Sequence, residues 1–223
     1  MAAPGREWLK RQGLLIKEEF STPWGICDLV GVSFSQERVR QRLNLGQRGP
    51  IGPPLRIALL NRIPDAQTGE TISIGQLESE FRDWVVPSAI QGELGHLIDS
   101  GFVISVRPDC LQKRNGWVPL HSRIVSLELK LSRVEEALNQ AWSHLRFATH
   151  SYVGFPRELA IRVAKSRRRR DFLGAGIGIV AVGPIRCEVL VPSRNRSSDE
   201  RDAVLQMHCV ERFWRSCVTN NGA

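Results

Sequence analysis

The sequence predicts an α/β protein that is interrupted by a smaller module, and three observations support this prediction. In the segment 124–131 (IVSLELKL), leucines alternate with polar residues, which is the period of a β-strand. Directly after it, apolar residues recur at helical spacing over 134–145. Earlier in the chain, the Gly/Pro-rich stretch 41–54 (QRLNLGQRGPIGPP) is typical of a domain boundary. Together these features indicate a discontinuous core around an insertion.

The composition excludes several classes of protein. Of the 223 residues, 42% are hydrophobic and 24% are charged, which is typical of a globular chain and not of a disordered or collagen-like one. No apolar run approaches the roughly 18 residues that a membrane span needs, and the start, MAAPGREWLKRQG, lacks the apolar segment of a signal peptide. Five scattered cysteines without a CxxC pair indicate reduced thiols, not a disulfide framework or a structural zinc site. We therefore expect a cytoplasmic protein with no membrane partner.

The chain is expected to open with a helix that is followed by a β-hairpin. Residues 5–15 place apolar side chains among basic ones, and Gly13 weakens or ends this helix. Two β-prone runs, 15–20 and 26–34, flank the turn residues STPWG. Asp28 lies within the second run, where an unpaired buried charge costs several kcal/mol. This carboxylate therefore needs a partner.

Residues 41–122 are predicted to form a module of their own. After the connector, the pattern predicts a helix, then a short strand with a second helix. It next predicts a third helix with Pro87 near its start and Gly101 just past its end. Strands are expected over 103–108 and 117–123, around a turn-rich segment. This order resembles that of a winged helix. The module is therefore expected to be a winged-helix-like α+β insertion.

The third helix of the module carries Glu93 and Asp99 but no Lys or Arg, so it is expected to bind phosphate poorly. Positive charge is concentrated only in the expected wing, at Arg107, Lys113 and Arg114. Two interpretations remain open. The module clamps nucleic acid through its wing, or it forms the surface for a homodimer or a protein partner.

The rest of the chain, 123–223, is predicted to join residues 1–40 in one core. Ser132 and Glu135 match the S-x-x-E capping box, so a helix should begin directly after the strand 124–131. The remaining strands and helices of this core are predicted from alternating and from helical spacing of apolar residues, respectively. Strands are expected over 151–156, 176–182 and 185–192, and helices over 157–170 and 198–214.

Four features of this core together resemble the PD-(D/E)XK nuclease superfamily. They are Asp28 in the hairpin, the strand motif Glu128-x-Lys130, Gln140 on the following helix, and the strand SYVGFP. The resemblance implies the restriction-endonuclease-like fold, a mixed sheet flanked by helices. It also implies that Asp28 and Glu128 bind a divalent metal. Lys130 would position or activate the attacking water, and Gln140 would belong to the catalytic site.

Elementary chemistry agrees with these roles. Mg²⁺ (or Mn²⁺) prefers hard oxygen ligands and keeps several waters, so two carboxylates on neighbouring strands leave room for a phosphate and a nucleophile. The period of a strand puts Glu128 and Lys130 on one face. We therefore expect Asp28 and Glu128 to lie on adjacent strands, although 100 positions separate them in the sequence.

The sequence departs from the family pattern at two positions. Cys27 stands where Pro is common, and His144 stands where many members carry a Tyr four residues after Gln140. We interpret His144 as an ordinary histidine on the polar face of a helix. Glu18 and Glu19 either supply a further metal carboxylate or belong to a solvated strand face.

The net charge of +8 is concentrated in the C-terminal half, where residues 123–223 hold 17 Lys and Arg against 10 Asp and Glu. The densest point is the run Arg167, Arg168, Arg169 and Arg170. Such a run also fits a solvated helix end, but its place in the basic half favours contact with phosphates. DNA is therefore the predicted partner.

These observations predict a metal-dependent endonuclease that hydrolyses phosphodiester bonds in DNA with Mg²⁺ or Mn²⁺ as its cofactor. Two alternatives remain. One is a catalytically inactive DNA-binding or regulatory protein that retains the nuclease fold. The other is a subunit that docks a partner enzyme through its insertion. A complete Asp/Glu/Lys set favours the enzyme, because an inactive protein has no physical reason to keep all three. Residues 41–122 hold 8 Lys and Arg against 8 Asp and Glu, and this neutral charge of the insertion keeps the docking alternative open.

Overall fold

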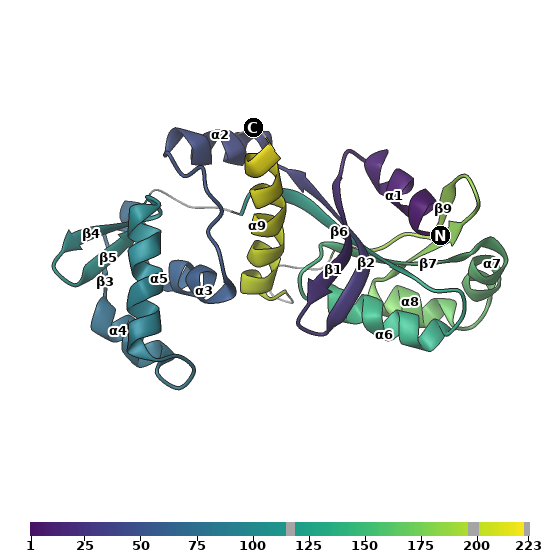
Figure 1. Ribbon diagram of the computed structural model, residues 1–223. Coiled ribbons are helices and arrows are strands. Elements are labelled where there is room, and N and C mark those ends of the chain that lie inside the picture. The colour runs from purple at the N-terminus through teal and green to yellow at the C-terminus, as the bar shows by residue number, and fades with distance from the viewer. Residues whose placement is uncertain (115–118, 196–200, 221–223) are drawn as a thin grey trace. The chain divides into compact units, whose positions relative to one another are not determined.

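The computed structural model describes three ranges of the chain, residues 1–114, 119–195 and 201–220. It is an α/β protein, as predicted, with a six-stranded mixed sheet and a smaller antiparallel sheet of three strands (Figure 1). Within these ranges, no helix is both long enough and apolar enough to cross a membrane.

The chain divides into two compact units. Unit 1 comprises Met1–Phe34 and His121–Gln206, and unit 2 comprises Ser35–Leu120 and Met207–Ala223. Unit 1 holds the larger sheet and the helices that cover it. Its elements are α1 (Ala2–Lys10), β1 (Leu15–Thr22), β2 (Gly25–Phe34), β6 (His121–Leu129), α6 (Val134–His144), β7 (His150–Pro156), α7 (Arg157–Lys165), α8 (Arg169–Ala175), β8 (Gly178–Val182) and β9 (Cys187–Val191).

The strands of unit 1 follow the order β1-β2-β6-β7-β8-β9. The central strands β6, β7 and β8 are parallel to one another, whereas β1, β2 and β9 add antiparallel edges. Alternation along the strands gives each face its own apolar cluster. Leu127 packs with Leu9 of α1 on one face, and Phe155 packs with residues of α6, α7 and α8 on the other. Figure 1 shows α1 on one side of the sheet and α6 and α8 on the opposite side. We call the second face the α6 face.

Strand β6 is covered on both sides, and this decides the environment of its polar residues. The Ser126 hydroxyl donates to Ser151 at 2.9 Å, and the Ser151 hydroxyl donates in turn to the Ala141 carbonyl of α6 at 2.8 Å. Glu128, two residues further on the α6 face, is 1% exposed. The alternation in this strand therefore separates two buried faces, and Glu128 is not part of a solvated charge pair.

Unit 2 begins with a helix that the sequence did not reveal. Ser35 caps it with its hydroxyl, which accepts from the Arg38 N–H, so the first residues of the expected connector 41–54 are helical. The three-stranded sheet has the order β3-β5-β4. The elements of unit 2 up to its sheet are α2 (Gln36–Asn44), α3 (Pro54–Arg62), a 3₁₀ turn (Ala66–Thr68), β3 (Ile72–Ser73), α4 (Ile74–Phe81), α5 (Pro87–Asp99), β4 (Val103–Arg107) and β5 (Cys110–Lys113).

The β-hairpin of unit 2 corrects the expected positions of its strands. Its second strand is Cys110–Lys113, where the sequence pattern predicts a turn, because Asp109 adopts a positive φ of 63° and closes a much tighter turn. Part of the strand expected over 117–123 lies outside the described residues, and His121 already belongs to β6.

Two helices of unit 1 also differ from the expectation. The helix expected over 157–170 breaks at Ser166, whose hydroxyl donates to the Val163 carbonyl and accepts from the Arg168 N–H, and these bonds compete with a continuous helix. Helix α6 begins as expected, but Arg133 in the left-handed region precedes it and no side chain caps it. The predicted capping box is therefore not formed.

The closing helix α9 (Ala203–Asn220) belongs mostly to unit 2, although we expected all of 123–223 in the core. The physical reason is a buried ion pair. Arg42 donates to both carboxylate oxygens of Glu211, at 2.6 and 2.9 Å, and both side chains are at most 3% exposed. The Trp214 indole N–H also donates to the Arg48 carbonyl at 2.8 Å.

Candidate metal and active site

The pairing of β2 with β6 brings Asp28 and Glu128 together. The two strands are antiparallel, and Leu29 lies opposite Leu127, so Asp28 and Glu128 follow directly in the register. The pairing ends at Leu29 and Leu127. The next hydrogen bond between the strands goes to a side chain, because the Asp28 Oδ2 accepts from the Leu129 N–H at 2.7 Å. The expectation that the two carboxylates lie on adjacent strands is confirmed.

Glu128 is a buried carboxylate with an incomplete set of partners. Its Oε1 lies 3.1 Å from the Lys130 Nζ, whereas its Oε2 has no hydrogen-bond partner among the described residues. Burial raises the pKa of Glu128, the negative charge of Asp28 raises it further, and Lys130 opposes both effects. Lys130 therefore offsets only part of the effect of burial and of the Asp28 charge on Glu128, and a bound cation would relieve the remainder.

Lys130 follows the end of β6 and lies between two carboxylates. Its Nζ is 3.1 Å from Glu128 and 3.5 Å from Glu136 of α6. Burial works to lower the pKa of Lys130, but its hydrogen bonds and ion pairs with these two glutamates outweigh burial and raise it. Lys130 is therefore a fixed cation at neutral pH and not a proton acceptor.

Helix α6 presents a stripe of polar side chains to this part of the sheet. Glu136, Gln140 and His144 are spaced by four residues and so share one side of the helix, while Ala137 and Ala141 are buried in the apolar cluster beside them. Gln140 Oε1 and His144 Nδ1 are buried and have no hydrogen-bond partner within the described part of the chain. Gln140 thus lies on the same side of α6 as Glu136, which contacts Lys130.

We predicted that His144 is an ordinary histidine on the polar face of its helix. This prediction is wrong, because the side chain is only 4% exposed. Burial lowers the pKa of His144 to about 4, with a smaller contribution from the positive charge of Lys130. The ring is therefore neutral at physiological pH. A neutral imidazole keeps a nitrogen lone pair that can bind a metal.

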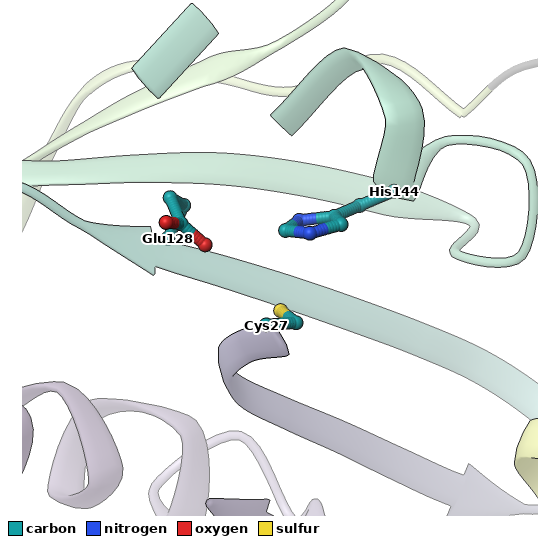
Figure 2. Close-up of side chains that lie close together, drawn as sticks. All are labelled: Cys27, Glu128 and His144. Carbon is teal, nitrogen blue, oxygen red and sulfur yellow. The ribbon is translucent and has the colours of Figure 1, made fainter. Parts of the chain in front are cut away.

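Cys27 also belongs to this site, although the sequence pattern indicated it only as the residue that replaces the Pro of the family motif. It precedes Asp28 on β2, is fully buried, and its thiol donates to the Leu29 carbonyl at 3.4 Å. Its Sγ, a carboxylate oxygen of Glu128 and a ring nitrogen of His144 all lie within 4.8 Å of one another (Figure 2). Burial, together with the negative charge of Glu128, raises the pKa of the Cys27 thiol well above its usual value.

Glu18 and Glu19 take no part in this site. Glu18 forms an ion pair with Arg6 at 2.7 Å, and both side chains are more than two-fifths exposed. Glu19 is exposed and has a positive φ of 48°. Of the two interpretations of these residues, the solvated strand face is the one that their exposure supports.

The arginines expected to bind nucleic acid are exposed. Arg167 and Arg168 lie in the turn between α7 and α8, and Arg169 and Arg170 begin α8, which covers the α6 face with α6 and α7. In the described ranges, no ion pair neutralises any of these four side chains. They are therefore available to an anionic ligand.

The three basic residues of the expected wing do not form one cluster at its tip. Arg107 ends β4 beside the turn, whereas Lys113 pairs with Val103 at the opposite end of the hairpin and Arg114 follows it. Lys113 is half-buried. Burial lowers the pKa of Lys113, and the negative charge of Asp65, which acts to raise it, only partly offsets this effect. Arg107 and Arg114 are exposed.

Comparisons with known proteins add no family to this picture. No family model matches the chain, and no curated protein matches it. One solved structure that it resembles is the SPO1766 protein of unknown function from Silicibacter pomeroyi, with 10% sequence identity, a TM-score of 0.38, and coverage of 100% of this chain and 91% of that chain. A similarity at this level carries no argument about fold family or function.

Proposed function

We propose that the protein is a metal-dependent endonuclease that hydrolyses phosphodiester bonds in DNA. The observation that carries the proposal is the meeting of Asp28, Glu128 and Lys130 at one point of the sheet, from two strands that are distant in the sequence. In this proposal unit 1 has the restriction-endonuclease-like fold, and Ser35–Leu120 is a winged-helix-like insertion. A cytoplasmic location remains part of the proposal.

The residues present fit a Mg²⁺ (or Mn²⁺) ion. Two carboxylates supply the hard oxygen donors that such an ion prefers, and the buried Glu128 Oε2 has no other partner among the described residues. Asp28 and Glu128 would hold the ion. When bound, it would supply positive charge against the phosphodiester and make a neighbouring water more acidic.

The chain's own residues would then orient the phosphate and the attacking water. Lys130 is held by Glu128 and Glu136 as a protonated ammonium, so it would stabilise negative charge on the phosphate and not accept a proton. Gln140, with a buried amide oxygen that lacks a partner in the described part, would accept a hydrogen bond from a water. Arg167–Arg170 would contact the DNA backbone and position it on unit 1.

The test is a cleavage assay with the purified full chain. Supercoiled plasmid and linear single strands are incubated with Mg²⁺, with Mn²⁺ and with a chelator. We expect metal-dependent cutting by the wild type and none by Asp28→Asn or Glu128→Gln. Glu19→Gln, which changes an exposed carboxylate outside the site, is the matched control and should cut at the wild-type rate. Tight DNA binding without any cutting would instead support the inactive DNA-binding alternative.

A second candidate function, docking of a partner protein through unit 2, is favoured by one exposed pair of apolar side chains. Trp84 and Val86, directly before α5, are 85% and 63% exposed. Helix α5 itself has no Lys or Arg, so this side of unit 2 suits a protein surface better than a phosphate backbone. If the partner is a second copy of the chain, Trp84→Ser should convert a dimer to a monomer in sedimentation and leave cleavage intact.

A further inference from the structure

Three donor atoms from three separate elements meet on the buried α6 side of β6. They are the Cys27 Sγ from β2, a Glu128 carboxylate oxygen from β6 and a His144 ring nitrogen from α6, and all lie within 4.8 Å of one another (Figure 2). Donor atoms that share one zinc ion at about 2.0–2.3 Å lie roughly 3.3–3.8 Å apart. The upper limit of 4.8 Å on the separations in this cluster exceeds that range by about 1 Å, so small side-chain shifts would bring all three donors to one ion.

Two of the three side chains carry polar atoms that nothing in the described part of the chain satisfies. Glu128 Oε2 and His144 Nδ1 are buried without a hydrogen-bond partner, in residues that are 1% and 4% exposed. Buried polar atoms almost always have a partner in folded proteins, so a pair of unsatisfied atoms in one place needs an explanation. A cation that binds through Glu128 Oε2 and His144 Nδ1 would satisfy both atoms.

The chemistry of the donors selects the kind of ion. A cysteine sulfur and an imidazole nitrogen suit Zn²⁺, whereas Mg²⁺ prefers oxygen donors alone. The neutral His144 ring offers a lone pair without losing a proton. The buried Cys27 thiol would give up its proton when the ion binds, because the positive charge of the ion then stabilises the thiolate.

We propose that Cys27, Glu128 and His144 bind one Zn²⁺ ion. Three protein ligands leave the fourth tetrahedral position open to water or to an incoming ligand. Zn²⁺ in this position would also compete with Mg²⁺ for Glu128 and inhibit cleavage, and this one consequence rests on the proposed nuclease function.

The experiment uses the full chain after treatment with a chelator. Zn²⁺ binding is measured by calorimetry, and Co²⁺, a spectroscopic substitute for Zn²⁺, is followed by absorption. We expect one ion per chain and a thiolate-to-cobalt charge-transfer band in the wild type. Cys27→Ser should abolish the band and lower Zn²⁺ affinity at least about 100-fold, because removing a mere supporting residue of a metal site already costs 10–100-fold. His144→Gln should lower the affinity similarly.

Cys209→Ser is the matched control, because Cys209 is also buried but lies in unit 2. It should bind Zn²⁺ as the wild type does. The proposal is overturned if wild-type protein shows no thiolate-to-cobalt band, a result that needs no variant to fold, or if Cys27→Ser binds Zn²⁺ with unchanged affinity. Asp28→Asn separates the two proposals, since it should lose Mg²⁺-dependent cleavage and keep the Zn²⁺ site.

Discussion

The backbone N–H of Leu129 donates a hydrogen bond of 2.7 Å to Oδ2 of Asp28, across a sequence separation of 101 residues. This bond fixes one carboxylate oxygen of Asp28 beside the strand that carries Glu128. It leaves Oδ1 of Asp28 free of that bond. The same contact therefore serves both the sheet and the site, and substitutions at Asp28 can separate the two roles.

Asp28→Ala should destabilise the protein, whereas Asp28→Asn should not. Alanine leaves the Leu129 N–H without its acceptor, which costs about 1–3 kcal/mol, while the asparagine amide oxygen can still accept. Urea unfolding of the chelator-treated proteins measures this difference. Equal stability of the two variants would show that the bond contributes nothing. Both variants should lose Mg²⁺ binding in calorimetry.

Lys130→Ala should lose the chemical step of cleavage and keep binding of both metal and DNA. The ammonium is paired with Glu128 and Glu136 and is positioned to stabilise charge, not to hold the metal. Single-turnover cleavage at saturating enzyme measures the step, and DNA binding is measured separately. A variant that cuts at the wild-type rate would refute the assignment of Lys130.

His144 should make the stability of the metal-free protein depend on pH. Its pKa is lowered from 6.5 to about 4, so the unfolded chain binds more protons than the folded chain between these values. Stability therefore rises with pH across this window, and about 3 kcal/mol is lost as pH falls through it. Urea unfolding from pH 4 to 7 in chelator measures the slope.

His144→Gln is the comparison that isolates this effect. Glu128 has a raised pKa and contributes a slope of the opposite sign, so the difference between wild type and variant is the informative quantity. The variant should lack the part of the slope that is due to His144. An identical pH dependence in both proteins would contradict the prediction.

Neutralising Arg167–Arg170 should flatten the salt dependence of DNA binding. Removing one arginine–phosphate interaction lowers the slope of log K against log salt by roughly 0.9 on duplex DNA. Titrations of one duplex at several salt concentrations, with wild type and an Arg→Gln quadruple variant, measure the slope. Substituting Gln91 and His96 on α5 should barely change affinity. The reverse result would identify unit 2 as the main DNA anchor.

The buried pair of Arg42 and Glu211 should be essential to unit 2. Glu211→Gln leaves a buried guanidinium without its charge partner, and breaking such a pair typically costs about 3–5 kcal/mol. Thermal and urea unfolding measure the loss. The exposed pair Arg62 and Glu80 is the matched control, because Arg62→Gln should cost at most about 1 kcal/mol. Similar losses at the two pairs would contradict this argument.

The sequence was sufficient wherever an element carries its own pattern. The alternation in β6 and the helical spacing in α6 identified both elements, and with them Glu128, Lys130 and Gln140. The adjacency of Asp28 and Glu128 followed from the strand pattern together with the resemblance to a nuclease family, and the strand pairing bears it out.

The rest depended on tertiary structure, which no local pattern encodes. Cys27 reaches the site through the pairing of β2 with β6, and His144 is buried because α6 packs on the sheet. The spacing of Glu136, Gln140 and His144 was the available signal. Short turns decided the other differences, since Asp109 needs a positive φ and Ser166 bonds to its own backbone neighbours.

The ends of the insertion are joined by a hydrogen bond of 2.8 Å from the Ser35 N–H to the Leu120 carbonyl. This bond bears on how the larger sheet folds. Pairing β2 with β6 in an otherwise unfolded chain requires closing a loop as long as Ser35–Leu120, and such a closure costs about 4 kcal/mol of chain entropy. An insertion that has already folded, with Glu211 of α9 paired to Arg42, holds these ends together and removes most of that cost. The rate-limiting step of sheet assembly should therefore accelerate once the insertion is folded, so the two halves of the core depend kinetically on a segment that contributes no strand to them.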